Sequence, residues 1–228
     1  MADWRFFRGW TGDELRAHVA EAARSSRNHD GIEAGMTGDR GWHHYHSEAV
    51  IAREPAGSVQ FQRARVALAN YQFSDPGIVL AHFDPSGQLL NRRILLEIQV
   101  LGLHYLCPAV VTHVRDEADV YGFRYDTLDG HIERGVEWFL LTKNDQGEIR
   151  FRIEARWRRG DFPNWWSRVG FMLLSGYYQR RWHRRAHRRL SLLAHYGSTA
   201  RPARDTAGLT HQGVDVTFTY HTKRKWLQ

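Results

Sequence analysis

The sequence predicts an α+β fold, in which a curved antiparallel sheet is wrapped around one long C-terminal helix and shorter helices come first. Three observations support this prediction. Hydrophobic residues alternate with a period of two between Ile78 and Trp157. Turn-forming residues divide that region into short strands. Apolar residues then recur at spacings of three and four between Asn164 and Tyr196, as on one face of a helix.

The N-terminal part predicts two helices separated by a strand. Thr11 followed three residues later by Glu14 forms a capping-box pattern, which predicts a helix from there to about residue 24. Residues 42–52 are expected to form the first strand. Apolar positions at helical spacing predict a second helix over 59–71, which ends before Pro76.

The alternating region predicts six strands, near residues 78–83, 93–101, 103–114, 119–127, 132–142 and 148–157. The last of them shows the clearest pattern. Its apolar side chains face one side of the sheet, and its arginines and Glu154 face the other. This alternation indicates a sheet with one buried face and one wet face, so the buried face needs a cover.

The long helix over residues 164–196 is the expected cover. It is predicted to end at Gly197 and to be about 45–50 Å long. A curved sheet closed by such a helix is a helix-grip architecture, whose interior often holds a pocket. The aromatic residues expected to line that pocket as ligand-binding residues are Tyr125, Trp138, Phe151, Tyr178 and Trp182.

Residues 1–197 are therefore expected to form a single domain, and residues 198–228 a linker with one further strand near 214–220. A single cysteine, Cys107, excludes an internal disulfide and is interpreted as a buried, inert thiol. Neither a secretory signal nor a stretch long enough to span a bilayer is visible in the sequence, which favours a cytoplasmic protein.

The formal net charge of +7 favours acidic partners. Much of it comes from six arginines within ten residues of the long helix, which are candidate anion-binding residues: Arg180, Arg181, Arg184, Arg185, Arg188 and Arg189. Arginine forks suit phosphate groups of nucleic acids or anionic lipids. The alternative interpretation is a solvated helix face.

His131, Glu133 and Glu137 are the candidate catalytic residues, because two carboxylates and a histidine can act as acid and base when buried. A four-residue turn over 144–147 would pair Lys143 with Glu148. That register places both glutamates on the outer face, near the arginines of the last strand, where they would serve only to stabilise the sheet.

His44 and His46 alternate like metal ligands on one strand, but two histidines are too few for a zinc site. We therefore expect no metal and no cofactor.

Several motifs resemble those of an uncharacterised family, domain of unknown function 1990. The main one is the run from Gly122 to Phe139, Gly-Phe-Arg-Tyr-Asp-Thr-Leu-Asp-Gly-His-Ile-Glu-Arg-Gly-Val-Glu-Trp-Phe. The segments 114–117, 147–153 and 179–185 also resemble the corresponding parts of this family. The resemblance covers roughly residues 5–195, and departs from the family pattern at residues 29–33. It implies a helix-grip fold of the lipid-transfer and polyketide-cyclase type, without an assigned activity.

Three functional hypotheses follow. The first is a protein that binds a small apolar or amphipathic ligand between sheet and helix. The second is a nucleic-acid or anionic-surface binder acting through the arginines of the long helix. The third is an enzyme that uses His131, Glu133 and Glu137, and it requires the two carboxylates to face the pocket.

Overall fold

The computed structural model describes residues 3–29, 41–55, 58–197 and 217–221. Every predicted helix is present, and every predicted strand within these ranges. The elements, in chain order, are β1 (Asp3–Phe6), α1 (Gly12–Ala22), β2 (His43–Arg53), α2 (Gln60–Ala69), β3 (Val79–His82), β4 (Arg93–Val100), β5 (Leu103–Asp116), β6 (Val120–Thr127), β7 (Glu133–Lys143), β8 (Glu148–Arg159), α3 (Trp165–Tyr196) and β9 (Thr217–His221).

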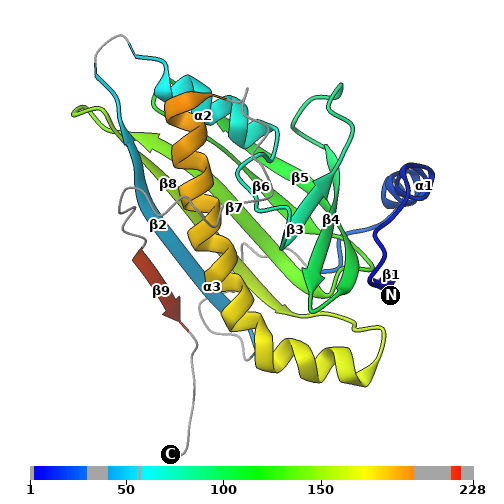
Figure 1. Cartoon of the computed structure of the whole chain (residues 1–228). Helices are drawn as coiled ribbons and strands as arrows, with labels where there is room; N and C mark the ends of the chain where they lie inside the picture. Colours follow the sequence, from blue (N-terminus) through cyan, green and yellow to red (C-terminus); the bar gives the residue numbers. More distant parts are fainter. Residues whose placement is uncertain (1–2, 30–40, 56–57, 198–216, 222–228) are drawn as a thin grey trace, which may run out of the picture.

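All the strands belong to one antiparallel sheet, which curves around α3 (Figure 1). The spatial order is β3-β4-β5-β6-β7-β8-β2-β9, and β1 pairs with β5 outside this path. Consecutive strands from β3 to β8 are neighbours, whereas β2 pairs with β8 at the far side. The fold is the predicted α+β helix grip.

The helix α3 begins and ends as its sequence predicts. The side chain of Asn164 caps the N-terminus by accepting a hydrogen bond from the backbone N–H of Ser167, and Gly197 ends the helix with φ 78°. The helix bends in its N-terminal part (Figure 1), which contains Gly170 and Gly176. Its C-terminal half packs firmly on the sheet, since Trp182, Ala186, Leu190 and Leu193 are buried there.

The core lies between the inner face of the sheet, α2 and α3. Phe73, which follows α2, is fully buried, and its ring contacts those of Phe139, Phe151 and Trp182 at centroid distances of 4.8, 5.4 and 6.2 Å. Aromatic rings at such distances pack favourably edge to face or tilted. This cluster fills the part of the interior next to α2. The remaining space between the sheet and α3 contains the site described below.

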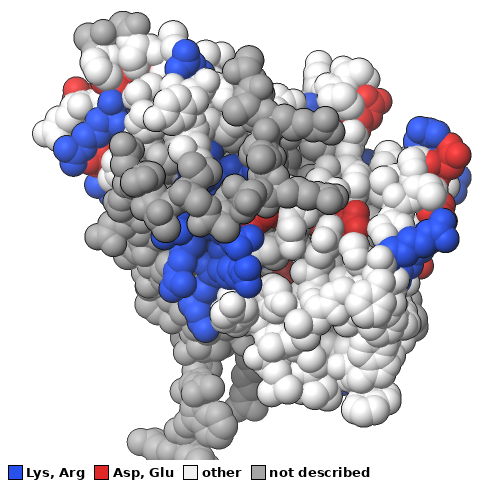
Figure 2. Space-filling view, in the orientation of Figure 1, with Lys and Arg blue, Asp and Glu red and all other residues white. Residues whose placement is uncertain are grey.

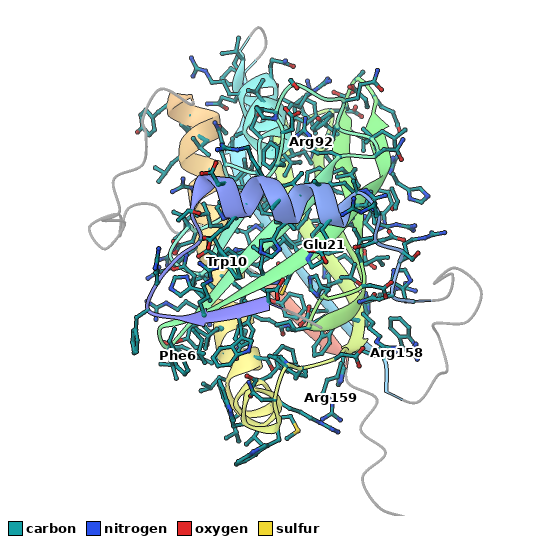
Figure 3. All side chains as sticks on the ribbon, turned by 90° about the vertical axis from the view of Figure 1, so that its right-hand side faces the viewer. Phe6, Trp10, Glu21, Arg92, Arg158 and Arg159 are labelled. Atoms are coloured by element: carbon teal, nitrogen blue, oxygen red, sulfur yellow. The ribbon has the colours of Figure 1, made fainter. Side chains whose placement is uncertain are left out.

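The N-terminal residues cover part of the outer face, where α1 lies across β4 and β5 (Figure 3). The predicted capping box of Thr11 and Glu14 is present. The strand β1 was not predicted from the sequence. It pairs with the first residues of β5, and Arg5 stacks on Trp10 with its guanidinium carbon 3.9 Å from the ring centroid.

The predicted register of β7 and β8 is wrong by one residue. Lys143 pairs with Ile149, not with Glu148. The backbone N–H of Asn144 instead donates to the carbonyl of Glu148, and Gly147 takes φ 75°. This is a hairpin whose left-handed glycine is followed by a bulge, so the returning strand gains one residue. A shift of one residue moves every side chain to the opposite face.

The strand β9 pairs with the free side of β2, from His44↔His221 to Glu48↔Thr217. The predicted linker after Gly197 and residues 214–216 of the predicted strand lie outside the described residues.

Candidate functional site

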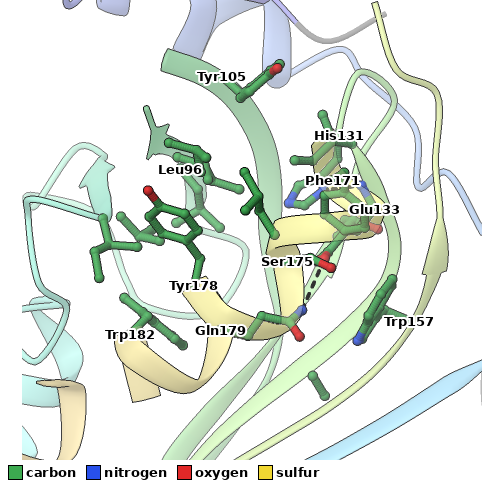
Figure 4. Close-up of a pocket in the computed structure, with 18 of the residues that line it drawn as sticks. Leu96, Tyr105, His131, Glu133, Trp157, Phe171, Ser175, Tyr178, Gln179 and Trp182 are labelled. Atoms are coloured by element: carbon green, nitrogen blue, oxygen red, sulfur yellow. Dashed lines mark hydrogen bonds between the residues drawn. The ribbon is translucent and has the colours of Figure 1, made fainter. Parts of the chain in front are cut away.

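A pocket with a cavity volume of about 220 Å³ lies between the sheet and the N-terminal half of α3 (Figure 4). Its walls come from the inner face of β4 to β8 and from α3, and they are mostly aliphatic and aromatic. The volume greatly exceeds the space that a single buried water needs. Trp157 and Phe171 close one side, with ring centroids 5.8 Å apart, while Leu96, Tyr178 and Trp182 lie on the other.

Glu133 and Glu137 face this pocket, and the prediction that they lie on the outer face was wrong. The observed register pairs Glu137 with Ala155 and Phe139 with Ile153, so both glutamates share the inner face with buried apolar residues. Gln179 of α3 points its amide at the Glu133 carboxylate, with 3.5 Å between nitrogen and oxygen (Figure 4).

The pocket keeps both carboxylates partly protonated near neutral pH. Loss of solvation, followed by the neighbouring charge of Glu137, raises the pKa of Glu133 to about 8. Loss of solvation also raises the pKa of Glu137 to about 7, against a hydrogen bond from the Tyr125 hydroxyl, which lowers it. The two groups therefore titrate as a coupled pair in the physiological range.

Gly135 separates the two glutamates and lets β7 and β8 approach closely. A Cβ atom at this position would lie 2.1 Å from the carbonyl oxygen of Arg156. Its backbone also exchanges hydrogen bonds with the Thr127 side chain at 2.8 and 3.1 Å. The glycine therefore fixes the position of the strand that carries the carboxylates, and it also lines the pocket between them.

His131 is buried beside the pair, and burial lowers its pKa to about 3, so the ring is neutral. Its Nδ1 accepts a hydrogen bond from the backbone N–H of Glu133 at 2.9 Å, which leaves the proton on Nε2. That Nε2 has no hydrogen-bond partner among the described residues. The same holds for the Tyr71 hydroxyl and the Trp157 indole nitrogen, and all three residues line the pocket.

Three of the five residues predicted to bind a ligand line the pocket: Tyr125, Tyr178 and Trp182. Phe151 is fully buried in the core cluster beside Phe73. The placement predicted for Trp138 was wrong for the same reason as that of the glutamates. It lies on the outer face opposite Glu154, under the guanidinium of Arg124.

The six arginines of α3 form two rows of different character. Arg181, Arg185 and Arg189 are partly buried, and each has a partner: Arg181 donates to the Tyr177 hydroxyl, Arg185 pairs with Asp75, and Arg189 donates to the Gln72 carbonyl. Arg180, Arg184 and Arg188 recur every four residues and are exposed. Figure 2 shows Lys and Arg side chains gathered over the middle of α3.

Exposed apolar side chains surround one end of the pocket. We call this group the apolar rim: Phe6, Phe7, Leu101, Trp165, Val169, Met172, Leu173 and Tyr177, each 39–84% exposed. The group is continuous, because Phe6 stacks on Trp166 with centroids 5.9 Å apart and Phe7 contacts the Leu101–Gly102 turn. Leu101 and Trp166 also line the pocket, so its wall reaches the rim.

The other candidates have structural roles in the described part of the chain. His44 contacts Glu154 at 3.0 Å, and among the described residues no three His, Cys, Asp or Glu side chains converge as metal ligands. Cys107 is fully buried, and burial raises the pKa of its thiol to about 12. None of the described helices has the length and apolar character needed to cross a bilayer.

Chemically, the site offers a carboxylate pair that can accept a hydrogen bond, a cation or a proton in an apolar surrounding. Both carboxylates face the pocket, which meets the requirement of the enzyme hypothesis, and groups with a pKa near neutrality suit proton transfer. His131 does not contact either carboxylate through a hydrogen bond, since its Nδ1 is bound to the backbone.

The comparisons with known proteins identify the family. The sequence model described as "Domain of unknown function (DUF1990)" matches residues 28–189. The chain belongs to the DUF1990 family. A UPF0548 protein from Deinococcus radiodurans is 31% identical over 107 residues, which are 42% of this chain and 54% of the relative. The match thus spans about half the length of that curated relative.

Solved structures with similar topology share little sequence with this DUF1990 chain. Ara h 8.0201 is 12% identical with a TM-score of 0.41, over 68% of this chain and 98% of that protein. A Thalictrum norcoclaurine synthase point mutant is 12% identical with a TM-score of 0.43, over 66% and 94%. Human STARD10 is 8% identical with a TM-score of 0.42, over 81% of each.

Sequence reasoning missed several pocket residues. Tyr71 follows α2 with φ 55°, a conformation that the sequence pattern does not reveal. Gln179 and Ser175 are polar residues of α3, whereas the prediction of a pocket used only the apolar stripe of this helix. The strongest sequence signal for a missed pocket residue was the alternation of β8, which places Trp157 on the inner face together with residues that are buried there.

Proposed function

We propose that this protein binds a small apolar or amphipathic molecule in the pocket between the sheet and α3. The observation that supports this most directly is a cavity of about 220 Å³ between the sheet and α3, whose walls are largely apolar. A cavity lined by apolar walls with a few polar groups at one side is the usual form of a ligand site.

The polar groups of the pocket support the same proposal. Three of its residues are at most 5% exposed and carry a donor without a partner among the described residues: Tyr71, His131 and Trp157. Buried polar groups in folded proteins are nearly always satisfied by protein, water or a ligand. A bound molecule with matching groups would satisfy them.

Native mass spectrometry of the purified protein, followed by denaturation, tests the proposal. We expect a mass above that of the chain that is lost on denaturation, or binding of an apolar fluorescent probe. Ala155→Phe fills the pocket from the inner face of β8, and should abolish binding. Ala118→Phe, at an exposed turn, makes the same change outside the pocket and should leave binding intact. Equal binding by the two variants would contradict the proposal.

We propose as a second function that α3 attaches the protein to anionic membrane surfaces. Five residues of the apolar rim and the whole exposed arginine row lie on this helix, which contains seven arginines and no acidic residue. An exposed apolar patch of this size is typical of an interaction site, and adjacent basic residues favour an anionic lipid surface. Each arginine near such a surface contributes about 1 kcal/mol.

Vesicle sedimentation distinguishes a membrane from nucleic acid. We expect binding to vesicles that contain phosphatidylglycerol and much weaker binding to pure phosphatidylcholine. Changing Arg180, Arg184 and Arg188 to Glu should abolish it, whereas the same change at Arg16, Arg24 and Arg53, elsewhere on the surface, should reduce it far less. Salt-dependent binding to an oligonucleotide without binding to either vesicle would refute the membrane proposal.

A further inference from the structure

The charge of the pocket is opposite to that of the protein. The chain has 32 Lys and Arg against 25 Asp and Glu. None of the described residues that line the cavity is Lys or Arg, while two are glutamates. The arginine-rich half of α3 is close by, yet its side chains point to solvent or to the α2 side, as the Arg185–Asp75 pair shows.

The two carboxylates also lack a cationic partner. No ion pair joins Glu133 or Glu137 to a Lys or Arg among the described residues, and their hydrogen bonds come from neutral groups, the Tyr125 hydroxyl and the Gln179 amide. Burial lowers the pKa of both histidines that line the pocket, His131 and His183, and keeps them uncharged. An ionised carboxylate in an apolar site is costly unless a cation or several donors accompany it.

Aromatic side chains line the walls of the cavity that holds the pair. Tyr71, Tyr125, Trp157 and Trp182 all line the same cavity, and the carboxylates lie on the strand next to that of Trp157. Aromatic rings attract cations through the negative charge of their faces, and this attraction is larger in a site without water. Carboxylates and ring faces together form a recognisable environment for an organic cation.

We propose that the ligand of this pocket is an organic amine, an apolar or aromatic molecule whose protonated nitrogen is bound by Glu133 and Glu137. This inference rests on the proposed ligand-binding function and specifies its ligand class. The ammonium N–H groups donate to the two carboxylates, the body of the ligand occupies the apolar part, and the Tyr125 hydroxyl holds Glu137 in place. Fatty acids and phosphate esters fit this pocket poorly, because their charge would meet two acidic groups and no arginine or lysine among the described lining residues.

Two series of matched probes test the charge preference by isothermal titration calorimetry at neutral pH. One series is 2-phenylethylamine, 2-phenylethanol and phenylacetate, and the other is decylamine, decanol and decanoate. Within each series the body is constant and only the head changes. We expect the amine to bind at least about tenfold more tightly than the alcohol, as for hydrogen bonds to charged groups, and the acid to bind most weakly.

The variants assign the preference to residues. In Glu133→Gln/Glu137→Gln the amine should lose its advantage and bind within about threefold of the alcohol, whose own affinity should persist and thereby show an intact pocket. Glu117→Gln, at an exposed turn, is the matched control and should bind as the natural protein does.

Each contrary outcome has a distinct meaning. An alcohol or acid that binds as tightly as its amine would overturn the amine proposal and leave the ligand-binding function standing. An amine preference that survives in the double variant would overturn the role of the two glutamates. Absence of binding by every probe, together with a protein that carries no bound molecule, would overturn both proposals.

Discussion

Replacing Glu133 by glutamine should stabilise the protein, and increasingly so as the pH rises. The carboxyl has an ordinary pKa of 4.5 and a folded-state pKa of about 8. The folded protein therefore holds a proton that the unfolded chain has already released. The stability that this proton contributes is complete below about pH 4.5 and is lost as the pH rises toward 8.

The magnitude follows from the same two values. Between about pH 5 and pH 7 the unfolded carboxyl is largely ionised and the folded one is not, so each pH unit costs up to about 1.4 kcal/mol and the interval about 2.5 kcal/mol. Glutamine has nearly the same shape but does not ionise, so Glu133→Gln does not lose this stability as the pH rises. Histidines buried as neutral rings, such as His131, have the opposite pH dependence, but they are common to both proteins and cancel in the difference.

Urea unfolding at several pH values between 5 and 8 measures this difference. We expect the two proteins to be nearly equal in stability at pH 5, and the variant to be about 2.5 kcal/mol more stable at pH 7. Glu117→Gln, on the surface, should show no such trend. A difference between the variant and the natural protein that stays constant from pH 5 to pH 8 would show that Glu133 does not titrate in the pocket as described.

Three further predictions concern the rest of the fold. Ser47→Ala should destabilise the protein by about 1–3 kcal/mol in urea unfolding, because the fully buried hydroxyl bridges two buried histidine rings at 2.7 and 3.0 Å, whereas Ser26→Ala, at an exposed position, should be nearly neutral. Gly135→Ala should lower the melting temperature markedly, and Gly87→Ala should not, because an added Cβ meets a backbone oxygen at the first position and nothing at the second. Cys107 should react with a thiol reagent only after denaturation, and rapid labelling of the native protein would contradict its burial.

Local sequence patterns predicted most of the architecture, because each element carries its own signals. The capping box of Thr11, the alternation of β8 and the stop at Gly197 involve neighbouring residues only, and all three are confirmed. The strand β1 escaped prediction because four residues hold too little periodicity, and its partner lies about 100 positions later in the chain.

The site was harder to predict because it depends on one residue of register. Alternation in β7 shows which side chains share a face, but both of its faces carry apolar residues. The choice between them rested on the turn at 144–147. The bulge after Gly147 reversed the outcome, so that Glu133 and Glu137 face the pocket and Trp138 faces outward. The conformation of a single glycine thus decided the inner face of β7, although β7 and β8 themselves were correctly predicted as strands.

The pairing of β9 with β2 has a consequence for how the protein behaves in a crowded solution. Without β9, the outer side of β2 would present a row of unpaired amide and carbonyl groups along an eleven-residue strand. Such rows recruit strands from other molecules and start aggregation. With β9 in place, the strands at the two ends of the sheet are only four and five residues long. By pairing with His44–Glu48, β9 therefore shortens the row of unpaired backbone groups on β2 that a strand of another molecule could extend.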